Sequence, residues 1–389
     1  MLMEKSILLL TNAYPDFPSS YRGIFIKRIA LQLKSEGWKV FIVTPKIFRE
    51  SEYFKEEKGV RVFRFPFFAS DRLLIEYSKI PYLRMIVYYI TGTLLTLYVT
   101  LKYRCQLIHA HWAIPTGLIG VLAGALLRKP LIVTVHGSDL RMATQSSFLK
   151  AIFLWVCRKA RHLICVSEEM RRGLENMGMD SNRIAVFPMG VDGIFFDIGG
   201  KRARRKENQS FTVLSNRNLQ PIYNVSHLIR AIPSVLREVP NARFLIAGDG
   251  LERERLRQEV DRLGIAASVT FLGKIPHEDM PSLLAEGDVY VSTSLSDGTS
   301  VSLLEAMASG AFPVVTDIAA NKEWITDGIN GFLVPVDDET SLAHKIIQSL
   351  RNEGLAEEAR QKNWKMVREK AYLEHHMEHL RTIYEPYVR

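Results

Sequence analysis

Two carboxylates flank a short polar turn in the second half of the chain. The stretch from Ser292 to Pro313 reads STSLSDGTSVSLLEAMASGAFP, with Asp297 before the turn and Glu305 eight residues later. A strand-like apolar run precedes the turn, and strong helix formers follow it until a glycine and a proline. The pattern predicts a strand, a tight loop and a helix whose unpaired N–H groups suit a phosphate. Alternatively, Asp297 only caps this helix and Glu305 is a solvated surface residue.

This stretch resembles the Glu-x7-Glu signature of the retaining glycosyltransferases of family 4, which have the GT-B fold. The first acid is Asp297 here, one methylene shorter than the usual glutamate, and Glu305 matches the second. The resemblance implies that Asp297 contacts hydroxyls of the donor sugar and that Glu305 holds the nucleotide ribose. It also implies that the residues between them offer backbone N–H groups to the sugar and the diphosphate: Gly298, Thr299, Ser300 and Val301.

The resemblance extends to a cation for the donor diphosphate. Members of the family present an arginine and, a few residues later, a lysine to this group. Arg217 matches the arginine, and a guanidinium can bind phosphate through two parallel hydrogen bonds. Alignment through the following helix puts Tyr223 at the lysine position and Asn224 at the next glycine, so one positive charge is missing.

Other donor-binding residues follow from the same resemblance. Gly248 lies in a Gly-x-Gly turn after a strand, and Ile275 follows the strand near which related enzymes read the base. Asn321 is expected to face the phosphates. The chain has no Asp-x-Asp motif, so Arg217, loop N–H groups and helix dipoles are expected to neutralise the leaving diphosphate without a metal or other cofactor.

Candidate residues in the first half follow strand-like segments. Gly23 closes the irregular loop TNAYPDFPSSYRG, where a glycine would let the backbone approach the donor diphosphate; an ordinary long connection is the alternative. His136 and Asp139 lie in the segment TVHGSD, which resembles the family's Thr-x-His-Gly-x-Asp pattern. The resemblance puts His136 near the primary hydroxyl of the donor sugar. The alternative is a strand-end turn in which Asp139 caps the next helix.

A His-x-His pair precedes this motif. His109 and His111 could in principle bind a metal, but no third ligand is spaced nearby, and we predict no metal site. The resemblance instead places His111, together with Asp139, on the acceptor side of the site.

The elements that position these residues alternate between strand and helix. Segments such as Ile7–Leu10, Leu131–Val135 and Val269–Gly273 read as strands, and Ile24–Ser35 and Thr116–Leu127 as helices. This alternation predicts parallel sheets with helices on both faces, in which ligands bind beyond the carboxyl ends of the strands. The resemblance implies two Rossmann-like, doubly wound parallel-sheet domains of the GT-B type, which face a central cleft.

At 389 residues the chain is long enough for two domains. We expect an acceptor-binding domain over residues 1–198, a basic linker over 199–210 and a nucleotide-sugar-binding domain over 211–365. The last segment, 366–389, is expected to be a helix that returns to the first domain.

Positive charge is concentrated in the first half. Residues 1–200 hold 27 Lys and Arg against 16 Asp and Glu, whereas the remainder holds 24 against 26. Such a basic domain favours an anionic partner, and we expect an anionic or lipid-linked glycan acceptor. Nucleic acid is a weak alternative because no aromatic residues alternate with the basic ones in the linker.

The segment Met85–Leu101 is uncharged over 17 residues. It contains glycine, threonine and tyrosine, so a helix packed on its domain is preferred over interfacial contact with a membrane, and contact over a true span. The nearby Lys79, Arg84, Lys102 and Arg104 would suit a membrane surface. The short apolar run at the N-terminus predicts a first strand and no signal peptide, and three isolated cysteines suit a reducing compartment. We therefore expect a cytoplasmic protein, peripheral on the inner face of the membrane if the contact exists.

These features together predict a retaining glycosyltransferase that moves a sugar from a nucleotide-activated donor, UDP- or GDP-linked, to an acceptor hydroxyl. Synthesis of polysaccharide, glycolipid or cell-surface glycan is the expected context. Two alternatives stay open: a nucleotide-sugar epimerase or phosphorylase of the same architecture, and a non-catalytic partner subunit. The second is suggested by Asp297 and Tyr223, which depart from the family pattern.

Overall fold

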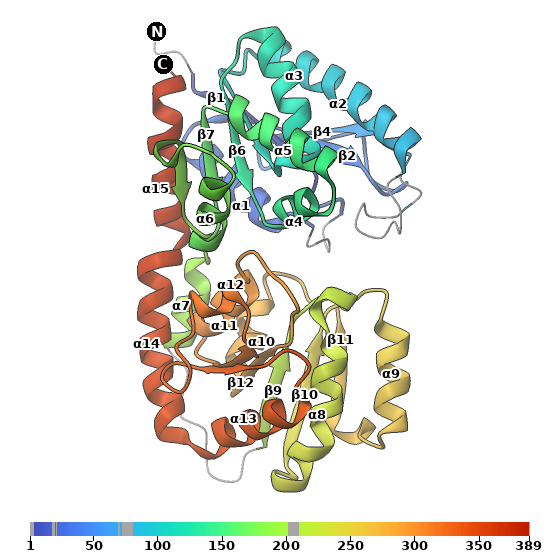
Figure 1. The fold of residues 1–389 in the computed structure, drawn as a ribbon, viewed down its shortest axis with the longest axis vertical. Coiled ribbons are helices and arrows are strands. Elements are labelled where there is room, and N and C mark those ends of the chain that lie inside the picture. The colour runs from blue at the N-terminus through green and yellow to red at the C-terminus, as the bar shows by residue number, and fades with distance from the viewer. Residues whose placement is uncertain are drawn as a thin grey trace. The chain divides into compact units, whose positions relative to one another are not determined.

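The chain folds into two compact α/β units in a computed structural model that describes residues 4–17, 20, 22–68, 71, 81–200 and 210–388 (Figure 1). One unit consists of Met1–Pro188 with His376–Arg389, and the other of Met189–His375. Helix α7 (Gly193–Gly200), expected in the first domain, belongs to the second, because Phe195 and Phe196 are buried in that unit's core. The Lys and Arg residues of the expected basic linker lie outside the described residues.

The first unit is built on an eight-stranded sheet of order β3-β4-β2-β1-β5-β6-β7-β8. Neighbouring strands are parallel, except that the edge strand β3 runs antiparallel to β4, which the sequence did not predict. All six residues of β1 are buried, as expected of a strand covered on both faces. The strands are β1 (Ser6–Thr11), β2 (Lys39–Lys46), β3 (Phe54–Glu57), β4 (Val60–Pro66), β5 (Leu107–His111), β6 (Leu131–Val135), β7 (His162–Cys165) and β8 (Ile184–Val186).

The helices of the first unit cover this sheet, as Figure 1 shows. Ser167 caps α6 by accepting a hydrogen bond from the backbone N–H of Met170. The helix expected over Thr116–Leu127 begins at Leu118, because a wider turn occupies Ala113–Gly117. The helices are α1 (Ile24–Ser35), α2 (Tyr82–Lys102), α3 (Leu118–Leu127), α4 (Ser138–Gln145), α5 (Ser147–Lys159) and α6 (Glu168–Asn176).

The second unit contains a fully parallel six-stranded sheet of order β11-β10-β9-β12-β13-β14. Its strands are β9 (Phe211–Ser215), β10 (Ala242–Ala247), β11 (Val269–Gly273), β12 (Val289–Ser292), β13 (Phe312–Thr316) and β14 (Phe332–Val334). Its further helices are α8 (Val225–Glu238), α9 (Arg253–Arg262), α10 (Met280–Glu286), α11 (Val301–Ala308), α12 (Ala319–Lys322), α13 (Glu339–Arg351) and α14 (Glu353–Ala371).

The C-terminal segment is two helices rather than one. Tyr372 is extended and bridges Val191 as a strand would, with Val191 N–H donating to Ala371 and Leu373 N–H donating to Val191. This pairing ends α14, and α15 (Leu373–Tyr384) follows. From His376 onward α15 belongs to the first unit, where Arg381 pairs with Glu36 at 2.7 Å.

Strand order locates the candidate sites within each unit. The chain begins at a central strand, builds outward on one side, and then crosses to the other side. This reversal falls between β1 and β5 in the first sheet and between β9 and β12 in the second. Open parallel sheets bind ligands beyond the carboxyl ends of the strands at such a reversal. The structure thus confirms the predicted fold class of two doubly wound parallel-sheet domains.

Candidate functional site

Arg217 is the central residue of the candidate site in the second unit. It follows β9, and its guanidinium reaches the loop after β12, the neighbouring strand across the reversal. Its Nη2 donates to Asp297 Oδ2 at 2.5 Å. Its Nη1 donates to Ser300 Oγ at 2.9 Å and to Ser302 Oγ at 2.6 Å. The predicted phosphate-binding cation and the first acid of the signature therefore meet directly.

The loop between β12 and α11 is shaped by its own polar side chains. Ser300, not Asp297, caps α11: its Oγ accepts from the N–H of Leu303 at 3.3 Å. Asp297 Oδ1 instead accepts from the N–H of Gly298 at 2.9 Å. Asp297 is therefore free of the capping role and available to the guanidinium. The contact between Ser302 and Arg217 was not predicted from the sequence. The only indication of it was the position of Ser302, two residues after the helix cap Ser300.

Tyr223 contributes its ring where the family usually has a lysine. The Arg217 guanidinium carbon lies 4.2 Å from the centre of this ring, a cation–π contact. Asn224 has φ of 46°, the left-handed conformation that glycine adopts most readily, which fits its alignment with the family's glycine. Thr293 holds this turn by donating to the carbonyl of Asn224 at 2.8 Å. The turn thus positions an aromatic face rather than a second cation on Arg217.

The Arg217 guanidinium keeps its positive charge although it is almost fully buried. Arg217 is only 8% exposed. Burial by itself would lower the pKa of Arg217, but the Asp297 carboxylate outweighs burial and raises it, so the guanidinium stays charged. The N-terminus of α11 adds positive dipole charge beside the same loop. A buried permanent cation next to a helix N-terminus can bind a diphosphate.

The other predicted donor residues of the second unit have more varied surroundings. Glu305 lies on α11 and is buried at 7% exposure. Asn321 is 1% exposed, and its amide donates to the carbonyl of Thr316 at 2.8 Å, which turns it into the domain. A Cβ on Gly248 would overlap the carbonyl of Arg217, so this glycine allows close packing on the Arg217 loop. Ile275 is half-buried and packs against a core cluster of this unit.

In the first unit, the predicted histidine motif forms a compact cluster in which His111 is buried and His136 is half-buried. His111 Nδ1 lies 3.1 Å from His136 Nε2, and the His136 ring packs against Trp112 and Phe25 at 4.4 and 5.3 Å between centres. His111 is fully buried, so it supports His136 instead of facing an acceptor. Burial, followed by the neighbouring histidines, keeps the pKa of His111 well below its usual range.

Asp139 is also fully buried, and it shapes the turn that carries His136. Its Oδ1 accepts from the N–H groups of His136, Gly137 and Leu140, and its Oδ2 from that of Ala113 at 2.8 Å. Burial raises the pKa of Asp139 to about 6, although these N–H groups oppose the rise. The acceptor contact that the resemblance implied for Asp139 would need an exposed oxygen, and Asp139 is 0% exposed.

Gly23 begins α1 in the left-handed conformation, with φ of 69°. A Cβ at this position would overlap the carbonyl oxygen of Ala13 across the predicted loop. The loop is further held by Arg22, which donates to Asp16 at 2.8 Å and to the carbonyl of Asn12 at 2.6 Å. The glycine is therefore required by the shape of the loop itself.

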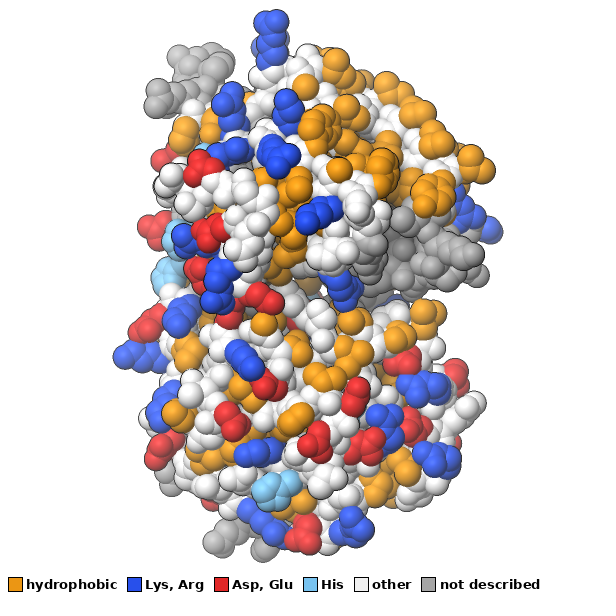
Figure 2. Space-filling view, viewed as in Figure 1, with side chains coloured by type: hydrophobic (Ala, Val, Ile, Leu, Met, Phe, Trp, Pro, Cys, Tyr) orange, Lys and Arg blue, Asp and Glu red, His pale blue; other side chains and the backbone are white. Residues whose placement is uncertain are grey.

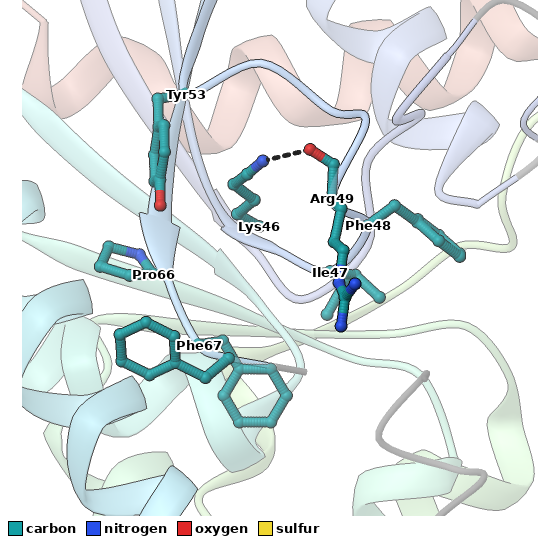
Figure 3. Close-up of a pocket in the computed structure, with 8 residues that line it drawn as sticks. Lys46, Ile47, Phe48, Arg49, Tyr53, Pro66 and Phe67 are labelled. Carbon is teal, nitrogen blue, oxygen red and sulfur yellow. Dashed lines mark hydrogen bonds between the residues drawn. The ribbon is translucent and has the colours of Figure 1, made fainter. Parts of the chain in front are cut away.

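A cavity of about 350 Å³ opens at the carboxyl ends of β2 and β4 in the first unit (Figure 3). Lys46 lines the cavity and donates to the carbonyls of Arg49 and Ser51 at 2.7 and 2.6 Å. The residues that line the cavity include two cations and several aromatic rings. They are Lys46, Ile47, Phe48, Arg49, Tyr53, Pro66, Phe67 and Phe68. Cations with aromatic faces suit a phosphorylated or glycosylated ligand. The cavity was not predicted from the sequence, because it forms only where the paired strands β2 and β4 end side by side.

Comparison with known proteins gives a consistent picture. The model of the Glycosyltransferase Family 4 domain matches residues 23–193, and that of Glycosyl transferases group 1 matches residues 200–366. An Escherichia coli UDP-Gal:alpha-D-GlcNAc-diphosphoundecaprenol alpha-1,3-galactosyltransferase is 25% identical over 83% of this chain and 84% of its own length. The phosphatidyl-myo-inositol mannosyltransferase of Mycobacterium tuberculosis is 31% identical over 61% of this chain and 63% of its own.

Solved structures share the fold. Anabaena HepE, in complex with UDP and glucose, superposes with a TM-score of 0.76, at 18% identity over 98% of this chain and 100% of that one. At this identity the likeness concerns the fold alone.

Proposed function

Because the chain belongs to the family 4 and group 1 glycosyltransferases, with the GT-B fold, we propose that it is a retaining enzyme that uses a nucleotide-sugar donor. The sugar is transferred to a hydroxyl group of an anionic, lipid-linked acceptor. One observation carries the donor side: a buried Arg217 meets Asp297 beside the N-terminus of α11, where the order of the second sheet reverses.

In the proposed reaction, the bond between the anomeric carbon and the diphosphate oxygen breaks. The acceptor oxygen forms its bond on the same face of the sugar, and its proton passes to the departing diphosphate. Negative charge builds on the diphosphate as the bond breaks, so a cation placed there in advance stabilises the transition state more than the bound donor. Arg217 is proposed for this role, with Asp297 at the donor sugar and Glu305 at the ribose.

The reaction is proposed to need no metal. Within the described part of the chain, no group of three His, Cys, Asp or Glu side chains could hold a metal ion. The Arg217 guanidinium and the α11 dipole provide positive charge at the donor site instead. Transfer should therefore continue unchanged in excess EDTA. Loss of activity in EDTA that manganese or magnesium restores would contradict this part of the proposal.

The acceptor side rests on the cavity in Figure 3 and on the relatives. The two relatives are named for a diphosphoundecaprenol-linked sugar and a phosphatidyl-inositol, both lipids that carry phosphate. A lipid-linked acceptor would place this protein at the cytoplasmic face of a membrane. Tyr53→Ala should raise the KM for such an acceptor and leave donor hydrolysis unchanged. Phe54→Ala, next to the cavity but not lining it, is the matched control.

The whole proposal is tested with the purified chain and a panel of UDP-, GDP- and ADP-sugars. One class of donor should raise the melting temperature, and the matching nucleoside diphosphate should be released when a lipid-linked acceptor is added. NMR of the product should show the α configuration. If no donor shifts the melting temperature and no nucleoside diphosphate is released, the chain is not a transferase. A β product would refute retention alone.

A further inference from the structure

Helix α2 exposes a continuous stripe of apolar side chains. The stripe recurs every three or four residues, as one face of a helix does. A helix that faces water would carry polar residues at these positions. The members of the stripe are between 49% and 81% exposed: Leu83, Ile86, Ile90, Leu94, Tyr98 and Leu101.

The opposite side of α2 packs against the rest of the first unit. Tyr88 is fully buried, with its ring 4.9 Å from Phe65 and 5.3 Å from Phe67. A Cβ on Gly92 would overlap Ile119 of α3, so the two helices are in close contact. By length and composition α2 is the one helix among the described residues that could cross a membrane, with a mean hydropathy of 1.3. Its packing on β4 and α3 keeps it along the surface of the unit instead.

The apolar surface continues onto α3. Leu122 is 40% exposed and Leu126 is 68% exposed, and α3 packs directly beside α2. Figure 2 shows hydrophobic side chains gathered over this part of the first unit. We call the α2 stripe with Leu122 and Leu126 the α2–α3 face. Contiguous exposed apolar surface on this scale marks an interaction site.

The charges around the α2–α3 face are almost all positive. Residues 81–167 include ten Lys and Arg and a single acid, Asp139. Because Asp139 is fully buried, this stretch presents no carboxylate to its surroundings. Lys102, which follows the stripe, donates from Nζ to the Tyr98 hydroxyl at 2.6 Å. Such a face is complementary to a partner that is both apolar and anionic.

A basic pocket of about 370 Å³ lies at the C-terminal end of α2. Its lining includes Phe41 and Tyr103, whose ring centres are 4.4 Å apart in a stacked arrangement. Its one lining carboxylate, Glu56, pairs with Arg61 at 2.9 Å, and Glu4 pairs with Lys39. The lining contains five cations: Lys34, Lys39, Arg61, Lys102 and Arg104. Since the pocket begins directly after Leu101, the apolar stripe leads into a site for phosphate.

We propose that the α2–α3 face docks on a lipid bilayer and that the basic pocket binds the phosphate of an anionic lipid headgroup. Helices that lie in a membrane interface combine apolar burial with attraction to anionic lipids. A second copy of this chain would fit poorly, because it would bring two sets of cations together, and the nearby carboxylates Glu56 and Glu4 already pair with Arg61 and Lys39. Docking on lipid gives a lipid-linked acceptor access to the enzyme, but vesicle binding does not depend on the proposed transfer reaction.

The full chain is tested by co-sedimentation with vesicles of phosphatidylcholine, with or without phosphatidylglycerol, in the absence of donor and acceptor. It should bind the anionic vesicles, more weakly in high salt, and release from them in alkaline carbonate. Donor hydrolysis, measured without vesicles, reports separately on the proposed function. If either vesicle binding or donor hydrolysis is not observed, the other measurement can still be interpreted.

Two paired variants test the two parts of the surface. Ile90→Gln with Leu94→Gln should weaken vesicle binding by at least about tenfold, since two buried aliphatic side chains are lost. Leu251→Gln with Ile329→Gln, exposed in the second unit, is the matched control. Lys102→Gln with Arg104→Gln should weaken binding to anionic vesicles by roughly 25-fold, about fivefold for each cation. Lys362→Gln with Lys365→Gln on α14 is the control for charge.

Several outcomes would overturn the proposal. The chain could fail to bind vesicles, or the apolar variant could bind like the parent chain. Resistance to alkaline carbonate would show that α2 spans the bilayer. A dimer in solution that the Ile90→Gln, Leu94→Gln variant dissociates, without vesicle binding, would assign the face to a second copy. Equal binding of the Lys102→Gln, Arg104→Gln variant would remove the headgroup pocket from the proposal.

Discussion

Arg217 illustrates how four side chains prepare one cation for a ligand. Asp297, Ser300 and Ser302 accept from its terminal nitrogens, and the Tyr223 ring lies against its plane. A donor diphosphate would have to take over bonds that these groups make without it. The aromatic ring at the usual lysine position does not replace a charge, but it orients the charge that remains.

Removal of this cation should be costly. Arg217→Ala should lower kcat/KM by at least about 100-fold, roughly 2.7 kcal/mol, because the diphosphate then lacks its buried partner. Arg217→Lys should recover only part of the loss, since it keeps the charge but loses the planar fork. Steady-state kinetics with the donor identified in the thermal-shift panel measures both. A folded Arg217→Ala variant of nearly parental activity would mean that another cation holds the diphosphate.

Asp297 should affect binding and turnover in opposite directions. Its carboxylate competes with the diphosphate for Arg217, so Asp297→Asn should tighten the binding of free nucleoside diphosphate by up to about fivefold, ~1 kcal/mol. Turnover should fall, because the proposed contact with the donor sugar is lost. Calorimetric titration and kinetics separate the two effects. Glu305→Gln should instead weaken nucleotide binding, and Glu358→Gln, an exposed carboxylate on α14, should change neither.

At the scale of elements, glycines decide where helices begin and how closely loops approach. Gly23 and Gly37 both have positive φ, at 69° and 87°, but only Gly23 has a neighbour in the space that a Cβ would fill. The two positions therefore separate backbone strain from close packing.

Gly37→Ala should cost about 1 kcal/mol of unfolding free energy, the strain of a left-handed alanine. Gly23→Ala should cost at least about 2 kcal/mol more, because the Ala13 carbonyl must also move. Urea denaturation followed by circular dichroism compares the two variants. Equal stability of the two variants, with a raised donor KM only for Gly23→Ala, would favour the predicted approach of Gly23 to the diphosphate over a role in the shape of the loop.

At the scale of the whole molecule, buried histidines tie distant parts of the chain together. His109 Nδ1 lies 2.5 Å from the hydroxyl of Tyr384 on α15, and its Nε2 lies 2.7 Å from Thr134. Burial lowers the pKa of His109 to about 3, and burial likewise lowers the pKa of His111 and of His136. The cluster is therefore neutral in the folded chain at neutral pH.

This cluster predicts acid sensitivity of the first unit. In the unfolded chain these histidines titrate near pH ~6.5, so on acidification the unfolded state takes up protons first. Their contribution to stability is complete above that pH and is lost as the pH falls below it, by about 1.4 kcal/mol per pH unit for each histidine. The urea concentration at the midpoint of unfolding should decrease as the pH is lowered from about 7.5 to about 5.5. His109→Gln should reduce the pH dependence, whereas an unchanged midpoint in the parent chain would contradict the prediction.

Local sequence determined much of this protein. Alternating apolar runs and strong helix formers identified strands such as Leu131–Val135 and helices such as Ile24–Ser35 at the observed bounds. Short motifs around Asp297 and Glu305 led to the family, because such patterns depend on neighbours a few residues apart. The parallel-sheet fold class followed from the order of the elements.

Only the tertiary structure decided which of these residues meet. Arg217 and Asp297 are 80 residues apart, and His109 and Tyr384 are 275 apart; strand order and the return of α15 bring them together. The sequence of α2 is uncharged from Met85 to Leu101, so charged residues could not show which side faces the solvent. Packing of Tyr88 and Gly92 settled that question and left the other side exposed, because burial depends on partners that lie far along the chain.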